Sequence, residues 1–401
     1  MNALSLALSS IRSRPLQSGL CILAASAGIA LLAALLLLSQ GVQDGFLRNA
    51  QGIDVVVGAK GSPLQLVLSS VYHADVPTGN IDMNDMEKLA HNSKVKSIIP
   101  IALGDNYRGF RIVGTVPEYL AHYGAEYAQG KVFAAPFDAV AGALTGLKTG
   151  DSFAGVHGLA ADGDDVHHFH DYKITGVLKP TGTVLDRLIV TALGSVQELH
   201  RHPDIGDPDA AEDLQVAHQV TALLVKVKSP IATMSLPREI NAKSDMIAGS
   251  PSYEMARLSQ SLGFGRDLLA AVGIGFVALS ALMLLSSLAS SLSARRYDLG
   301  VLRVLGASPE TLAGTVAAEG LMLAGAGTVA GIALGHALAY QMAANVSSLG
   351  GVVAPASFLK FHALDGWLLA MGVVTGLFAA AVPAASAART DIAGLLARGR
   401  A

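Results

Sequence analysis

Four long apolar runs constrain this chain more than any other feature of its sequence. The first, Ser18–Leu38, has no charged residue, and the others are Leu268–Leu292, Leu312–Tyr340 and Leu364–Ala388. About 20 apolar residues in a helix cross the hydrocarbon core of a bilayer. We therefore expect an α-helical membrane protein with four transmembrane helices, at residues 18–40, 266–292, 311–340 and 364–388.

Composition agrees with this class. Of 401 residues, 51% are hydrophobic and only 15% charged, and the mean hydropathy is +0.47, whereas soluble chains carry about 25% charged residues. The net charge of −3 indicates no nucleic-acid partner. The single cysteine, Cys21, excludes an internal disulfide.

The first run could also be a secretory signal peptide, because Arg12 and Arg14 precede it. We interpret it as a retained helix. The run is long, the flank after it at Gln43 and Asp44 lacks a clear small-x-small cleavage site, and the rest of the chain is itself membranous.

Residues 41–265 form a large polar segment, which we expect to be an α+β domain with its own core. Apolar, strand-like runs are separated by Gly, Pro and Asp; these runs are Ile53–Val57, Val95–Leu103, Phe110–Val116, Tyr172–Leu178, Leu188–Leu193 and Val220–Val227. Helical spacing of apolar residues predicts helices at Ser62–Ala74 and Met83–His91.

Arginine and lysine near the helix ends predict the orientation. They gather before the first helix, between the second and third, and after the fourth, whereas only Lys360 lies between the third and fourth. Because basic residues mark cytoplasmic loops, we expect residues 1–17, 293–310 and 389–401 inside the cell. Residues 41–265 and 341–363 would then lie outside.

The third run is rich in Gly and Ala, which suits close helix packing in lipid. It contains Glu319 near its start and His336 near its end. For both we expect a place at the water interface rather than in a proton relay.

The segment 293–310, SARRYDLGVLRVLGASPE, separates the second and third runs. In a helix, Arg296, Gly300 and Arg303 would share one face, and glycine there would let another backbone approach. Pro309 suits the first turn of the next helix. We expect this segment to dock a cytoplasmic partner; the alternative is a plain connector whose arginines only mark the cytoplasmic side.

Residues 295–307, RRYDLGVLRVLGA, carry a family resemblance. They are similar to the segment after the second helix in MacB/FtsX-like permeases of ABC transporters, with Asp298 where the family usually has Glu. The family's C-terminal pattern is matched by Pro383, Ala384, Arg389, Leu395 and Leu396. The family's outer-domain patterns are matched by Leu147–Phe153 and by Gly176–Leu178 followed by Thr181, Gly182 and Asp186.

The resemblance implies a permease subunit in the bacterial cytoplasmic (inner) membrane, without catalytic or cofactor-binding residues of its own. Its partners would be a separate cytoplasmic ATPase, a second permease chain (a copy or a relative), membrane lipids, and a periplasmic substrate or adaptor. ATP hydrolysis would move the outer domain to export or extract a substrate. The ATPase-coupling residues would be Arg295, Arg296, Asp298, Gly300, Arg303 and Gly306.

Gly58-Ala59-Lys60-Gly61-Ser62 superficially suggests a phosphate-binding loop. Its spacing differs from Gly-x4-Gly-Lys-Ser/Thr, and the sequence has no other such motif, so ATP must be bound by another protein. We expect a tight turn followed by a helix.

Three histidines and an aspartate, His167, His168, His170 and Asp171, are candidate ligands for Zn²⁺ or Cu²⁺. Their Gly/Asp-rich surroundings favour a solvated loop instead. Metal transport or sensing at this loop is thus the alternative function. A membrane-anchored hydrolase is a weaker alternative, because no Gly-x-Ser-x-Gly motif occurs.

Overall fold

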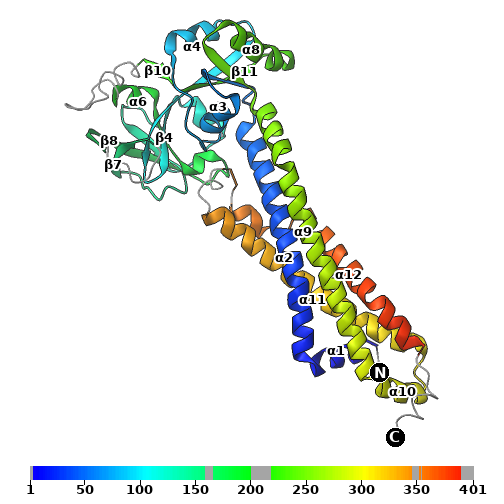
Figure 1. Cartoon of the computed structure of the whole chain (residues 1–401). Coiled ribbons are helices and arrows are strands. Elements are labelled where there is room, and N and C mark those ends of the chain that lie inside the picture. Colours follow the sequence, from blue (N-terminus) through cyan, green and yellow to red (C-terminus); the bar gives the residue numbers. More distant parts are fainter. Residues whose placement is uncertain (1–2, 159–165, 200–217, 346–351, 354, 390–401) are drawn as a thin grey trace. The chain divides into compact units, whose positions relative to one another are not determined.

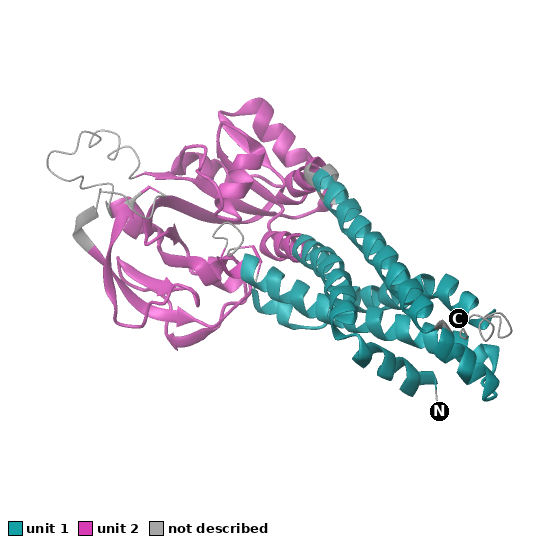
Figure 2. Cartoon of the chain, turned by 60° about the horizontal axis from the view of Figure 1, so that its bottom comes forward, with its two compact units in different colours: residues 1–40, 263–342, 355–401 teal, residues 41–262, 343–354 magenta. Residues whose placement is uncertain are grey.

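The computed structural model describes residues 3–158, 166–199, 218–345, 352–353 and 355–389. The chain divides into two compact units (Figure 2). Unit 1 comprises residues 1–40, 263–342 and 355–401, and unit 2 comprises residues 41–262 and 343–354.

Unit 1 is built from helices (Figure 1). They are α1 (Ala3–Ser13), the first part of α2 (Pro15–Ala50), most of α9 (Pro251–Ala294), α10 (Arg296–Val304), most of α11 (Pro309–Asn345) and α12 (Ala363–Ala388), with a 3₁₀ turn, η2, at Pro355–Leu359. Among the described residues, four helical stretches are long and apolar enough to cross a membrane: Pro15–Ala50, Asp267–Ala294, Pro309–Asn345 and Ala363–Ala388. The prediction of four membrane-spanning helices is confirmed.

Small residues let α11 approach α2 closely, as its Gly/Ala content predicts. A Cβ added at Gly327 would lie 2.5 Å from the Cβ of Ala25, and one added at Gly335 would lie 2.5 Å from the Cβ of Ala33. At Gly331, between them, an added Cβ would lie 2.7 Å from the Cβ of Ile29. Gly327, Gly331 and Gly335 recur every fourth residue and therefore form one face of α11.

A neighbouring face of α11 packs antiparallel against α12. A Cβ added at Gly320 would lie 2.9 Å from the Cβ of Ala380, and one added at Gly376 would lie 2.8 Å from the Cβ of Ala324. Glycines on both helices, Gly320 and Gly376, thus allow α11 and α12 to pack closely.

Unit 2 contains a ten-stranded mixed sheet in the order β12-β1-β11-β3-β4-β9-β6-β8-β5, with β7 pairing with β3 and β8. A separate two-stranded sheet joins β10 and β2. The strands are β1 (Val55–Ala59), β2 (Ile81–Asp82), β3 (Val95–Tyr107), β4 (Phe110–Thr115), β5 (Tyr127–Gly130), β6 (Asp138–Ala141), β7 (Ser152–His157), β8 (Val166–Leu178), β9 (Leu188–Ala192), β10 (Gln219–Val220), β11 (Ala222–Val227) and β12 (Met246–Gly249).

Short helices cover this sheet, and two hydrophobic clusters lie within unit 2. The helices are α3 (Pro63–Ser70), α4 (Met83–Ala90), α5 (Glu118–His122), α6 (Leu193–Leu199) and α8 (Pro230–Lys243), with a 3₁₀ turn, η1, at Val184–Arg187. One cluster joins β1 and β11 to α8 through residues such as Val57, Leu223 and Leu236. The other includes Phe153 and Tyr172, whose rings stack with centroids 5.5 Å apart.

The predicted α+β character of this segment is confirmed. Each strand-like run of the sequence overlaps an observed strand, with Val220–Val227 divided between β10 and β11, and both predicted helices are present as α3 and α4. Strands β2, β5, β6, β7 and β12 were not predicted. They are short, and residues such as Gln129 and Asp138 interrupt the apolar pattern that marks a strand.

Three helices contribute residues to both units: α2, α9 and, through its last three residues, α11. Residues 15–40 of α2 belong to unit 1 and residues 41–50 to unit 2, while α9 contributes residues 251–262 to unit 2 and 263–294 to unit 1. At residues 40/41, 262/263 and 342/343 the chain therefore passes from one unit to the other within a helix.

Candidate functional site

Within the 293–310 segment, residues Arg296–Val304 form the short helix α10, and a turn separates it from α11. Leu305 closes the helix with its N–H bonded to the Val301 carbonyl (3.0 Å). Gly306 follows with φ +97°, a backbone conformation that favours glycine. Ser308 then caps α11, its hydroxyl accepting the Thr311 N–H (3.2 Å). The prediction that Pro309 begins the next helix is confirmed.

One face of α10 packs against α11 and α12. Leu299 is buried in a cluster with Leu312 and Ala387, and Leu302 packs against the same cluster. Gly300 is also buried rather than open on the surface. The expected approach of another backbone at Gly300 therefore does not fit the structure of this chain.

The opposite face of α10 is apolar and exposed. Its side chains follow helical spacing and remain largely accessible: Tyr297 (59% exposed), Val301 (37%), Val304 (60%) and Leu305 (78%). We call these four residues the α10 strip. Sequence reasoning assigned the partner to the arginine face, whereas the structure leaves the apolar face without a partner among the described residues.

Arg295, directly before α10, is held inside unit 1. Its guanidinium donates to the Ser10 hydroxyl of α1 and lies 3.9 Å from a carboxylate oxygen of Glu319 in α11. Glu319 is only 7% exposed, and its expected place at the water interface of the membrane stays a prediction. Arg295 thus connects α10 to two other helices and is not free to reach a partner.

The remaining predicted coupling residues differ in accessibility. Asp298 is exposed. Arg303 is partly buried, and its Nη1 donates to the Ala307 carbonyl (3.0 Å), which supports the end of α10. Gly306 supplies the turn described above. The side chain of Arg296 lies outside the described residues.

The histidine-rich stretch belongs to a strand over part of its length. β8 begins at Val166 and includes His167, His168 and His170, whose side chains lie outside the described part of the structure. Asp171 is exposed and pairs with Ala154 of β7. Whether these residues bind metal therefore stays a prediction.

Lys60, the lysine of the segment Gly58–Ser62 that superficially suggests a phosphate-binding loop, lies in a turn. β1 ends at Ala59, and the exposed Lys60 Nζ lies 3.5 Å from Asp245 Oδ1. Ser62 caps α3 by accepting the Gln65 N–H (3.4 Å). The expectation of a tight turn and a helix is confirmed.

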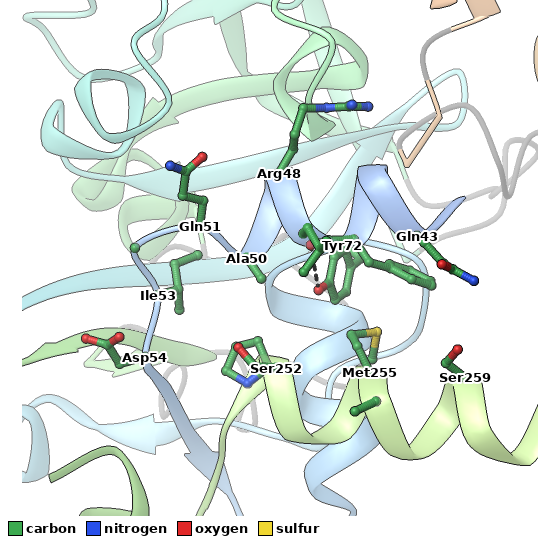
Figure 3. A pocket seen from close by; sticks show the side chains of 15 residues that line it. Gln43, Arg48, Ala50, Gln51, Ile53, Asp54, Tyr72, Ser252, Met255 and Ser259 are labelled. Carbon is green, nitrogen blue, oxygen red and sulfur yellow. Dashed lines mark hydrogen bonds between the residues drawn. The ribbon is translucent and has the colours of Figure 1, made fainter. Parts of the chain in front are cut away.

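A cavity of about 640 Å³ lies in unit 2 between the end of α2 and the start of α9 (Figure 3). Gln43 and Arg48 come from α2, and Ser252, Met255 and Ser259 come from α9. The hydroxyl of Tyr72 donates to the Phe46 carbonyl (3.2 Å), and burial raises the pKa of Tyr72. The sequence has no motif that marks this cavity, because its lining comes from segments about 200 residues apart.

Two family models match the chain. The FtsX-like permease C-terminal model matches residues 270–392, and the MacB-like periplasmic core domain model matches residues 18–243. No curated protein sequence matches it.

Two solved structures are similar at low identity. The crystal structure of the periplasmic region of MacB from Actinobacillus actinomycetemcomitans has 12% identity and a TM-score of 0.33, covering 53% of this chain and 95% of that chain. The extracellular domain of the noncanonic ABC-type transporter YknZ from Gram-positive bacteria has 12% identity and a TM-score of 0.29. The match covers 49% of this chain and 98% of that chain. Both TM-scores are low, so neither likeness supports a conclusion about function.

Proposed function

Because this chain belongs to the MacB/FtsX-like family of ABC transporter permeases, we propose that it couples ATP hydrolysis in a separate cytoplasmic ATPase to movement of residues 41–265. The family prediction from residues 295–307 is confirmed, and the family defines the chain as a transport subunit. The observation that carries the coupling proposal is the α10 strip, an exposed apolar helix face between two membrane-spanning helices.

The occupant of the α10 strip would be the ATPase subunit. An amphipathic helix binds a partner by placing its apolar face in a groove, and an ABC permease has an ATPase on its cytoplasmic side. The basic residues around segment 293–310 support a cytoplasmic position. Asp298, which is exposed, would be a charged contact beside the strip, and Arg296 would add a positive charge to the interface. Arg295, Arg303 and Gly306 would hold α10 in shape.

Force on α10 would pass into the membrane helices through packed contacts. Leu299 and Leu302 contact the cluster that contains Leu312 of α11 and Ala387 of α12. Arg295 adds polar contacts to α1 and α11. Because packed helices do not deform continuously, a shift of α10 would move these elements with it. Helices α2 and α9, which contribute to both units, would carry the movement to unit 2.

The substrate would be handled outside the cytoplasmic membrane by a pair of permease chains. The family resemblance supports this arrangement, and the asymmetry of arginine and lysine supports the orientation. No cofactor would be bound by this chain for the coupling itself.

The test is co-expression of the chain with each candidate ABC ATPase subunit of the same organism. Val304→Glu/Leu305→Glu places two charges on the α10 strip, and we expect at least about tenfold weaker co-purification and a matching loss of stimulated ATP hydrolysis. Arg296→Glu should weaken binding through charge instead.

Ile231→Glu is the matched control, because Ile231 is an equally exposed apolar side chain (79%) on α8 of unit 2. It should bind and stimulate the ATPase like the parent. If the double variant also behaves like the parent, segment 293–310 is only a connector and the coupling proposal is wrong.

A further inference from the structure

Three titratable side chains that no motif connects meet at one end of α11. His336 lies in α11, His362 precedes the first residue of α12, and Asp365 lies in its first turn. Nitrogen and oxygen atoms of the three side chains all lie within 4.8 Å of one another. The two imidazole centroids are 5.8 Å apart.

His336 and Asp365 are each held in place by backbone groups. The Nδ1 of His336 lies 2.6 Å from the Phe358 carbonyl oxygen, to which it donates, and this bond directs Nε2 toward Asp365 Oδ1 at 3.0 Å. The side chain of Asp365 is fully buried, and its second oxygen accepts the backbone N–H of His362 (2.7 Å). Metal-binding histidines are commonly oriented in this way, by a carbonyl on the nitrogen that does not bind the ion.

The third side chain, that of His362, is not held in place by such a bond at Nδ1. The Nδ1 atom of His362 is buried, and it has no hydrogen-bond partner among the residues that the structure describes. A buried polar atom without a partner destabilises the folded protein, because its lost hydration is not replaced. The ion pair between His336 and Asp365 leaves that atom unpaired, so it accounts for only two of the three groups.

We propose that His336 Nε2, His362 Nδ1 and Asp365 Oδ1 bind one divalent transition-metal ion, and that this ion is Zn²⁺. Two imidazoles and one carboxylate are a usual protein ligand set for zinc, with a fourth position left for water. Two imidazoles at Zn–N distances of about 2.0–2.1 Å place their ring centres roughly 5 to 6 Å apart, which agrees with the observed separation. On binding, the Nε2 proton of His336 leaves to solvent, and bonds to the ion replace its hydrogen bond with Asp365.

The ion would join three elements of unit 1 at one point. His336 lies on α11, and His362 and Asp365 lie on both sides of the start of α12. The third element, the 3₁₀ turn η2, would be fixed through the carbonyl of Phe358. This site shares no residue with the histidine-rich stretch at residues 167–171 or with the α10 strip, so the proposal does not depend on ATPase coupling.

The experiment is Zn²⁺ titration of the full chain in detergent, purified with a histidine-free affinity tag and stripped with EDTA. The parent for all measurements carries the triple substitution His167→Ala/His168→Ala/His170→Ala. These changes remove the candidate ligands of the histidine-rich stretch. We expect one Zn²⁺ per chain and a higher melting temperature with zinc. Co²⁺ in the same protein should give the visible absorption of a four-coordinate ion.

His362→Gln is the deciding variant. Because His362 Nδ1 has no hydrogen-bond partner among the described residues, this change should largely preserve the metal-free melting temperature while lowering Zn²⁺ affinity at least about tenfold. Asp365→Asn should lower the affinity too, but it also weakens the start of α12. If His362→Gln binds zinc as tightly as the parent, or if the parent binds no zinc, the proposal is wrong and the three groups form only a hydrogen-bonded contact.

Discussion

The carboxylate of Asp186 closes the turn that leads from β8 to β9. One oxygen accepts both the backbone N–H (2.7 Å) and the hydroxyl (2.8 Å) of Thr181, and the other accepts the Gly182 N–H (2.8 Å). Asp186 is only 6% exposed. The Thr-Gly and Asp pattern noted in the sequence therefore has a physical basis, since one side chain satisfies three donors.

Asp186→Asn should destabilise the protein by about 1–3 kcal/mol, because its amide N–H₂ would face a backbone donor at one of the two oxygen positions. Melting temperature of the full chain in detergent measures this. Asp245→Asn, at a fully exposed side chain, is the matched control and should change little. Equal melting temperatures for the two variants would contradict the role of Asp186.

His73 is a buried base in unit 2. Its Nε2 lies 3.0 Å from the Tyr119 hydroxyl, and burial, with a smaller effect of the Arg111 charge, lowers the pKa of His73 from 6.5 to about 3. The folded protein thus keeps this imidazole neutral where the unfolded chain would bind a proton. Stability from the neutral form is complete above pH 6.5 and is lost as the pH falls toward 3.

We expect the free energy of unfolding to fall below pH 6.5 with a contribution from His73 of at most roughly 1.4 kcal/mol per pH unit. His73→Asn removes this titration and tolerates the left-handed backbone at this position (φ +51°). Denaturant unfolding at several pH values measures the slope. The variant should show the smaller slope in acid and the same slope as the parent at alkaline pH; equal slopes in acid would contradict the prediction.

At the scale of elements, helix packing in unit 1 depends on which glycines of α11 face a neighbouring helix. Gly331 on α11 lies against α2, where an added Cβ would come within 2.8 Å of the Ser26 carbonyl oxygen. Gly325 on the same helix has nothing within 4 Å of an added Cβ. Hydropathy alone does not distinguish these two glycines.

Gly331→Leu should therefore separate α2 from α11 and destabilise the protein by about 1–3 kcal/mol or more. Gly325→Leu is the same change on the same helix and should be nearly neutral. Melting temperatures in detergent compare them. Similar losses in both variants would mean that leucine harms α11 wherever it is placed, and the close packing would not be the cause.

At the scale of the whole molecule, the arrangement of basic residues predicts the orientation. Cys21 is the only cysteine and is buried, so a Cys21→Ala chain is a clean background for labelling. Thr149 and Glu310 are both exposed, the first in segment 41–265 and the second in segment 293–310.

In intact cells, a membrane-impermeant maleimide should label Thr149→Cys and leave Glu310→Cys unlabelled until the membrane is opened, because residues 293–310 would face the cytoplasm. A reporter active only outside the cytoplasm should likewise work when fused near residue 150 and fail at the C-terminus. The reverse labelling pattern would overturn the orientation.

The order and type of elements could be predicted from the sequence because they depend on local patterns. Apolar runs long enough for a bilayer determine the four helices, and alternating apolar segments determine most strands of unit 2. The motif at residues 295–307 was enough to identify the family. The amphipathic character of α10 was also predictable from spacing, although the sequence does not say which of its faces is buried.

Tertiary structure decided the choices that depend on distant neighbours. Gly300 is buried and the α10 strip is exposed because the cluster around Leu312 and Ala387 covers one side of the helix. His336 meets Asp365 because α11 and α12 pack together across 29 residues of chain. Such contacts arise from packing between segments, and no local pattern of the sequence records them.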